Sequence, residues 1–397
     1  MAQNLQFSAA LAGSFPDGAS RDGALSGGLL RWVGPALLLV LLGVPALAKD
    51  TIIPVTGRPT RDVDIVSETY KEVVYRLAGV PSDQRMSAER VKEIRHDDTP
   101  EAFTKALEAK SRGEYENAIQ SFRLAIEKGK RPWVQEYSLF EIAECYQLWG
   151  QADSSKYTRA VESYKELKNR FPQSRFVPQA DIDLGKSLTG AGDYAQAEQH
   201  FTALENTARD AYGIIWEIEA KLGGANNLEV QAKYGEARSK YTSISNAARG
   251  EIRRIPSGDA AAQVKAAILQ KLADEARLRE GICFIRAGSY SEARTFYDGM
   301  ISEGLRNKDS KGLGGAYNGR GEAFFQLKEY MKALQDFAQA STVYFNDSDE
   351  TARALYFTGL TIETMEGKAS SRSKSYFEEV AKFFPGTKWA TMAKVKM

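Results

Sequence analysis

Residue types that could do chemistry are scarce in this sequence of 397 residues, which holds only 2 His and 2 Cys. So few His and Cys residues cannot build the usual zinc sites unless carboxylates supply most of the ligands. His96 precedes Asp97 and Asp98 and could act as a base or a ligand, but we interpret this group as a solvated linker. Residues 312–315 lack the Lys-Ser/Thr pair of a phosphate-binding loop and predict a turn. We therefore expect no catalytic residue, no cofactor and no metal site, and a protein that is not an enzyme.

The remaining Cys, His and capping residues have structural interpretations. Cys145 and Cys283 each lie in an apolar helical pattern; they could form a disulfide in an oxidising compartment, but we favour two buried small hydrophobic residues. His200 precedes an aromatic residue and is predicted to face solvent. Asp259 precedes an Ala-rich stretch and is predicted to cap a helix.

The overall charge argues against nucleic acid as a partner. The sequence has 53 Lys and Arg residues against 52 Asp and Glu residues, a formal net charge of +1. Non-specific binding to nucleic acid needs a concentrated basic face, which this balance does not indicate. With 43% hydrophobic and 26% charged residues, the composition is that of an ordinary folded protein.

An apolar run near the amino terminus has the parts of a secretory signal. A positive residue precedes the uncharged stretch 32–47, and Ala46 and Ala48 form the small-x-small pattern of a signal-peptidase site. This run is shorter than the roughly 20 residues that a membrane-spanning helix needs. We expect residues 1–48 to be a cleaved signal peptide, with a retained membrane anchor as the alternative. Residues 1–28 hold acidic residues and fit a misassigned start. The mature chain is then exported to the periplasm or cell envelope.

The segment 49–98 differs in residue pattern from the rest of the chain that follows it. Short β-branched runs alternate there with Gly-Pro and Ser-Asp turn signals. The candidate strands are Thr51–Val55, Val63–Val66, Glu72–Leu77 and Val91–Arg95. Four or five such strands predict a small, curled, β-rich module.

From residue 99 onward, one pattern recurs: Gly-x-Tyr-x-x-Ala-x-x-x-aromatic. It is complete in the copies that hold Ala118, Ala197 and Ala293, and it lacks the Gly in those that hold Ala160, Ala237 and Ala333. A degenerate seventh copy holds Ser373. Helix geometry accounts for each position. The Gly ends one helix in a left-handed cap, the small residue lets two helices approach closely, and the aromatic residue fills the groove against the following repeat.

This recurring pattern resembles the tetratricopeptide repeat. The Phe-Pro pairs at 171–172 and 384–385 are similar to those of exported bacterial envelope members, such as the Tol–Pal cell-division coordinator and outer-membrane assembly lipoproteins. The resemblance implies a mostly α fold, a right-handed α-solenoid of about seven helical hairpins over residues 99–397. The copies are spaced by about 40 residues rather than the usual 34 or so. The long interval between Ala237 and Ala293 predicts an additional helical stretch from Ala260 to Arg277.

The resemblance also implies where a partner would bind. In this family the first helices of the pairs line a concave groove, which contacts peptides. The corresponding positions here are mixed in charge and include two aromatic sites: Tyr137, Phe140, Glu144, Gln147, Lys186, Arg286, Asn318, Glu322, Gln326, Arg353 and Tyr356. We therefore expect a non-enzymatic scaffold that holds a peptide or partner helix of another envelope protein. The alternative is a membrane-anchored accessory subunit, whose β module binds a membrane complex or cell-wall polymer while the repeats act as a spacer.

Overall fold

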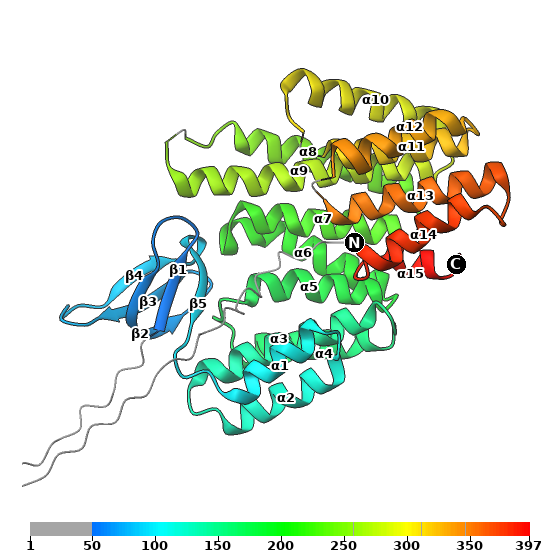
Figure 1. Cartoon of the computed structure of the whole chain (residues 1–397). Coiled ribbons are helices and arrows are strands. Elements are labelled where there is room, and N and C mark those ends of the chain that lie inside the picture. Colours follow the sequence, from blue (N-terminus) through cyan, green and yellow to red (C-terminus); the bar gives the residue numbers. More distant parts are fainter. Residues whose placement is uncertain (1–49, 257, 311, 346) are drawn as a thin grey trace, which may run out of the picture. The chain divides into compact units, whose positions relative to one another are not determined.

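The computed structural model describes residues 50–256, 258–310, 312–345 and 347–397. The expected signal peptide, with Ala46 and Ala48, lies outside these residues. The described chain divides into two compact units (Figure 1). The sheet unit comprises residues 50–67 and 73–98, and the helical unit comprises 68–72 and 99–397.

The sheet unit is one five-stranded sheet in the order β4-β3-β2-β1-β5. Its strands are β1 (Asp50–Pro54), β2 (Thr60–Glu68), β3 (Glu72–Leu77), β4 (Gln84–Ser87) and β5 (Val91–Arg95). The strands are antiparallel, which confirms the predicted β-rich module. The short β4 is absent from the candidate strands because its sequence, Gln-Arg-Met-Ser, is mostly polar. Ile52, Val63 and Ile94 are among the residues that form the small core.

His96 is buried, so its interpretation as part of a solvated linker is wrong. Its side chain is 2% exposed, and its Nδ1 lies 3.4 Å from the Oδ2 of Asp50, which is fully buried. The backbone N–H of Asp97 donates to the other oxygen of Asp50 at 3.1 Å. This contact joins residues far apart in sequence because β1, which begins at Asp50, pairs with β5, which ends just before His96.

The helical unit consists of consecutive helix pairs, which confirms the predicted solenoid. In the described residues, fourteen helices form seven such pairs and a fifteenth follows them. The pairs are α1 (Glu101–Ser111) with α2 (Tyr115–Lys128), α3 (Pro132–Gly150) with α4 (Lys156–Arg170), α5 (Val177–Gly190) with α6 (Tyr194–Tyr212), α7 (Ile214–Val230) with α8 (Tyr234–Ile252), α9 (Ala260–Arg286) with α10 (Tyr290–Asn307), α11 (Leu313–Gln326) with α12 (Tyr330–Ala338), and α13 (Ser348–Glu366) with α14 (Ser371–Phe383). The last helix is α15 (Lys388–Lys394), and a short π-helix, Gln339–Val343, continues α12. None of the helices described is long and apolar enough to cross a membrane.

In most pairs, the turn between the two helices contains a residue in the left-handed backbone conformation, with a positive φ angle. Gly113, Gly192 and Gly288 adopt positive φ angles of 76°, 82° and 78° at the positions that the repeat pattern predicts. In two copies that lack the glycine, Ala232 and Lys328 occupy the same conformation, with φ of 61° and 64°. Residues with a Cβ enter this region at a cost. The repeat therefore keeps its turn geometry even where the favourable residue is absent.

Aromatic rings of the second helices are held between glycines of two successive first helices. A Cβ added to Gly281 of α9 or to Gly319 of α11 would lie 2.3 Å and 2.1 Å, respectively, from the ring of Tyr297. Phe201 is held in the same way between Gly185 of α5 and Gly223 of α7. Both rings are almost completely buried. The prediction that the aromatic residue fills the groove toward the following repeat is thus confirmed, and glycines of the first helices provide the space for it.

The long interval between repeats is filled by one helix and not by an additional one. Residues from Ala260 to Arg286 form the single helix α9 of 27 residues, because no Pro or turn signal interrupts them. Asp259 caps this helix by accepting a hydrogen bond from the N–H of Ala261, as predicted. The predicted turn at 312–315 is also corrected: Gly312 is the N-cap, and Leu313 already lies in the first turn of α11.

The two cysteines are free and buried, which agrees with the interpretation as small hydrophobic residues. Cys145 packs in the core of the first repeats and Cys283 in that of the middle repeats. His200 is half-buried rather than exposed, because its Nε2 lies 2.7 Å from the carbonyl oxygen of Asp181 on the preceding helix. Burial lowers the pKa of this imidazole.

The packing of Tyr297 yields the first prediction. Gly281→Ala should lower the free energy of unfolding by about 2 kcal/mol, because overpacking against a buried ring outweighs the gain of about 1 kcal/mol in helix propensity. Gly299→Ala is the matched control, since Gly299 lies in the neighbouring α10 with nothing within 4 Å of an added Cβ. This control should stabilise the protein by up to about 1 kcal/mol. Urea denaturation of both variants measures the difference, and equal effects would contradict the packing argument.

Candidate protein-binding site

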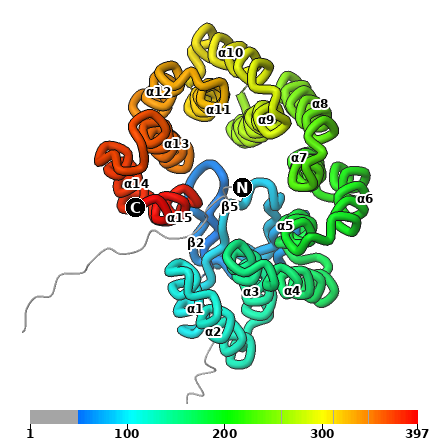
Figure 2. The backbone as a smooth tube through the Cα atoms, turned by 90° about the vertical axis from the view of Figure 1, so that its right-hand side faces the viewer, coloured from blue at the N-terminus to red at the C-terminus, as the bar shows by residue number. Residues whose placement is uncertain are grey.

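The first helices of the pairs lie on the inner side of the helical unit. Figure 2 shows α3, α5, α7, α9, α11 and α13 inside, and the second helices outside. We call the surface formed by these six first helices the inner face. All eleven residues predicted to contact a partner belong to these helices. Phe140, Asn318, Arg353 and Tyr356 are buried, Arg286 and Gln326 are exposed, and the other five are intermediate.

The two aromatic residues predicted on α3 belong to a packed cluster. Phe140 stacks on Phe176, with ring centroids 4.5 Å apart, and Tyr137 meets the same ring edge-on at 4.6 Å. The Tyr137 hydroxyl donates to Glu68, which belongs to the helical unit, at 2.6 Å. Burial raises the pKa of Tyr137 well above its ordinary value. These rings hold the first repeats together and present little free surface.

Glu144 and Gln147 are engaged with neighbouring helices. The Nζ of Lys110, on α1, lies 2.6 Å from Glu144 and 2.5 Å from Glu141. Gln147 accepts a hydrogen bond of 2.8 Å from the hydroxyl of the buried Tyr164 on α4. Burial raises the pKa of the Glu144 carboxyl from its ordinary 4.5 to about 7, although Lys110 acts in the opposite direction. Two carboxylates that share one lysine leave this end of the inner face acidic.

Lys186 is the cation at the centre of an acidic group on α5 and α7. Its Nζ lies 3.2 Å from the carboxylate of Asp183, which also accepts from Gln179 at 2.7 Å. Burial opposes the charge of Lys186, but Asp183 and Glu219 outweigh it, so the pKa of the lysine is raised. Burial also raises the pKa of Glu219. Glu219 was not among the predicted residues, although it lies near the start of a first helix, as Tyr137 does on α3.

Glu229 joins three helices and fixes the position of Arg286. Its buried carboxylate accepts a hydrogen bond of 2.7 Å from Tyr241 and lies 3.3 Å from Arg279. Arg286 forms an ion pair with the other oxygen at 2.8 Å, while 47% of its own side chain stays exposed. The arginine is therefore held by its guanidinium group, while about half of its side chain remains accessible to solvent. Sequence reasoning found Arg286 but missed Glu229, which no residue spacing distinguishes from other glutamates.

Three predicted residues of α11 and α13 meet in one network. Arg353, which is buried, donates to Glu322 at 2.6 Å and to Glu350 at 3.2 Å. Asn318, fully buried, donates to both the backbone oxygen and the side chain of Glu350 at 2.7 Å. The network links two successive first helices directly. Its members position the inner face, and the side chain of Glu350 is more exposed than that of Glu322.

Partly exposed apolar side chains also belong to the first helices of the last repeats. Leu278, Phe325 and Leu360 are half-buried on α9, α11 and α13. Tyr356 packs with Phe377 and Trp389, at centroid distances of 5.6 Å and 5.7 Å, and so supports this region from behind. A surface of fixed charges and partly exposed apolar groups is suited to contact with a peptide or a protein.

In the described residues, no group of three or more His, Cys, Asp or Glu side chains could hold a metal ion. The charged groups of the inner face are spread along six helices and bonded to one another, whereas acid–base chemistry needs groups that converge on one reacting atom.

The comparisons with known proteins identify the repeats. Residues 137–174, which include most of α3 and all of α4, match a family model of the tetratricopeptide repeat, and residues 257–308, which include α9 and α10, match a second one. Two parts of the helical unit are thus similar to tetratricopeptide repeats. No curated protein matches the chain.

Several solved structures have a similar arrangement of helices. A tetratricopeptide repeat protein from Parabacteroides merdae ATCC 43184 is 16% identical, with 74% of this chain and 98% of that one covered and a TM-score of 0.40. NprR in complex with its cognate peptide NprX is 10% identical, with coverages of 75% and 81% and a TM-score of 0.40. A Rap protein complexed with competence and sporulation factor is 13% identical, with coverages of 74% and 72% and a TM-score of 0.37.

Glu144 yields a prediction of pH dependence. Its pKa is raised by folding, so the folded state binds more protons than the unfolded state between about pH 4.5 and 7, and stability falls as the pH rises through that range. Glu144→Gln mimics the protonated form. It should raise the free energy of unfolding by about 1–3 kcal/mol at pH 8 and by much less at pH 5. Denaturation at both pH values measures this, and an equal effect at the two would contradict the assignment.

Proposed function

We propose that this chain is a non-enzymatic scaffold of the bacterial periplasm or cell envelope, which holds a peptide or partner helix of another protein on its inner face. The proposal rests on the observation that charged side chains of the inner face are held in fixed positions. They are fixed by ion pairs between successive helices, as for Arg286 on Glu229 and Arg353 on Glu322. A surface whose side chains are already ordered loses less entropy when a partner binds.

The predicted residues of the inner face have two proposed roles, according to whether their side chains are exposed or buried. Arg286 and Gln326 are exposed and are proposed to contact the partner. Phe140, Asn318, Arg353 and Tyr356 are buried and are proposed to position the exposed groups. Arginine beside partly exposed apolar side chains, such as Leu278 and Phe325, is typical of the residues that dominate binding energy at protein interfaces.

The charge pattern indicates a partner of mixed charge. The inner face carries the cations Lys186, Arg279 and Arg286 beside the carboxylates of Glu144, Glu219 and Glu322. A partner with a single strong charge would meet repulsion along part of such a face, whereas an extended segment that alternates in charge and hydrophobicity would not. We therefore propose that the bound segment is amphipathic and carries both acidic and basic residues.

The setting in the envelope rests on the signal-like stretch 32–47 and on the resemblance of the Phe-Pro repeats to exported tetratricopeptide proteins. In the alternative, the segment stays in the membrane and the sheet unit binds a membrane complex or cell-wall polymer. The two differ in where the binding residues lie, and a capture experiment separates them.

The capture experiment uses the mature chain, residues 49–397, and an extract of the cell envelope. We expect a variant with Arg286→Ala and Gln326→Ala to lose the partner that the unchanged chain retains, because the exposed contacts are removed while Glu229 keeps Arg279 and Tyr241. The matched control is Lys332→Ala with Gln335→Ala, the same residue classes exposed on the outer helix α12. Mass spectrometry quantifies the captured proteins. Equal capture by all three chains would move the binding site away from the inner face and support the alternative.

Export is tested separately with a reporter. Residues 1–60 fused to alkaline phosphatase without its own signal should give an active enzyme, because that enzyme needs disulfides that form in oxidising compartments. Amino-terminal sequencing of the mature product should begin at Lys49. The control fusion lacks residues 32–47. Activity that is equal with and without this stretch, or a product that keeps it, would contradict a cleaved signal.

A further inference from the structure

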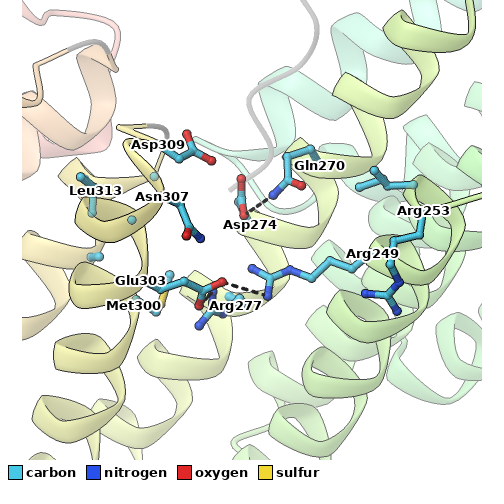
Figure 3. Close-up of a pocket in the computed structure, with 14 residues that line it drawn as sticks. Arg249, Arg253, Gln270, Asp274, Arg277, Met300, Glu303, Asn307, Asp309 and Leu313 are labelled. Atoms are coloured by element: carbon cyan, nitrogen blue, oxygen red, sulfur yellow. Dashed lines mark hydrogen bonds and ion pairs between the residues drawn. The ribbon is translucent and has the colours of Figure 1, made fainter. Parts of the chain in front are cut away.

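The long helix α9 opens a cavity on the helical unit. The carboxyl-terminal ends of α8 and α10 form two walls, the middle of α9 lies between them, and the start of α11 closes one end (Figure 3). The cavity has a volume of about 310 Å³. It exists because α9, with 27 residues, is much longer than α11, with 14, so that α10 does not cover all of it. The lining residues include none of the eleven predicted on the inner face.

One wall of this cavity is cationic. Arg249 lies in the last turn of α8 and Arg253 is the C-cap residue that follows it, and both line the cavity. Arg249 has one long contact with Glu303, at 3.5 Å, and that carboxylate already forms a closer ion pair with Arg277, at 2.8 Å. Among the described residues, no carboxylate pairs with Arg253, which is exposed. The guanidinium groups of Arg249 and Arg253 therefore keep N–H donors that no close ion pair within the described ranges engages.

The opposite side of the cavity is acidic. Asp274 of α9 points into the cavity between Gln270 and Glu303, and Asp309 lies above it (Figure 3). One oxygen of Asp274 accepts from Gln270 at 2.8 Å, and no ion pair reaches this carboxylate in the described chain. Burial raises the pKa of the Asp274 carboxyl, against the effects of Gln270 and Arg249. A cationic group placed here would compensate the desolvated carboxylate.

Size and charge together define the ligand. The volume corresponds to roughly ten water molecules, which is room for one or two amino-acid residues and too little for a polymer or a folded partner. Three arginines and three carboxylates line the cavity, so a simple anion or cation would meet repulsion from one side. We propose that the cavity binds a small zwitterion, an amino acid or dipeptide, whose carboxylate contacts Arg249 and Arg253 and whose ammonium group contacts Asp274. Apolar side chains at one end, including Met300 and Leu313, contact its side chain.

Because the cavity lies between successive repeats, binding of this ligand would affect how those repeats are held together. A molecule bound to Arg253, which follows the end of α8, and to Asp274 of α9 would link two successive repeats. The site is independent of the partner proposed for the inner face, and its occupation would stabilise the middle repeats by mass action.

The test uses the mature chain and the dipeptide L-alanyl-L-alanine, with binding followed by NMR titration and by the rise in Tm. Two blocked probes, the N-acetylated and the C-amidated dipeptide, each lack one charge. We expect both to bind about tenfold or more weakly, because each loses a charge-assisted hydrogen bond. Blocked probes that bind as well as the free dipeptide would overturn the proposal, as would the absence of any binding.

Two adjacent arginines provide a matched pair of variants. Arg253→Gln removes a group that lines the cavity, whereas Arg254→Gln removes its neighbour, which is exposed and pairs with Glu251 at 3.1 Å instead. The first should weaken binding of the dipeptide about tenfold, and the second should leave it unchanged. Asp274→Asn should weaken the free dipeptide and not the N-acetylated one. Circular dichroism verifies that each variant is folded, and equal affinities of the two arginine variants would contradict the assignment.

Discussion

The close contact of an aromatic ring with two glycines is the constraint on which the helical unit depends. Tyr297 belongs to α10, yet the space that it fills is made by Gly281 in its own pair and by Gly319 in the next one. The ring thereby sets two helix–helix distances at once. Phe201 does the same for α5 and α7. Such a contact joins neighbours only, so the unit is built by repeating a local rule, and its stability is close to a sum over pairs and the interfaces between them.

Because the rings fix the separation of the first helices, they also fix where polar side chains meet. Charged residues on successive first helices come within ion-pair distance, as Arg353 does with Glu322 and Arg286 with Glu229. A buried ion pair is weak support for stability, since desolvation offsets much of the attraction. Its effect here is geometric: each pair holds one long side chain in a single orientation on the inner face. The apolar packing thus provides stability, and the polar contacts provide an ordered surface.

The repeats were predictable from sequence because each position of the pattern has its own steric reason and recurs. Gly288 needs a left-handed φ, Ala293 needs to be small, and Tyr297 needs a space to fill, and these three independent requirements coincide in the three complete copies. The candidate contacts were predictable only as positions on a helix. Whether such a position holds an exposed contact, as at Gln326, or a buried support, as at Asn318, depends on the residue opposite it on the next helix. The sequence around a position does not reveal which residue will lie opposite it on the next helix.

The same reason explains the residues that sequence analysis misplaced. His96 looked solvated because its neighbours are acidic, but the pairing of β1 with β5 brings Asp50 to it. Glu229 attracted no notice because it is one glutamate among many, and only the fold gathers Tyr241, Arg279 and Arg286 around it. The 27-residue α9 is a different case, since the sequence predicted an additional helical stretch from Ala260 to Arg277, whereas the helix continues without a break to Arg286. The cavity beside α9 follows from that length.

A unit whose rings bridge adjacent pairs alone has a particular mechanical character. Each of its five inner pairs contacts the pair before and the pair after, and among the described helices no contact of comparable extent joins the first pair to the last. A stretching force applied at the two ends would act on these interfaces in series, so that pairs would detach one at a time, each lengthening the chain by a similar increment. A protein of this kind can yield under tension and recover repeat by repeat, which suits a tether between structures that move relative to each other.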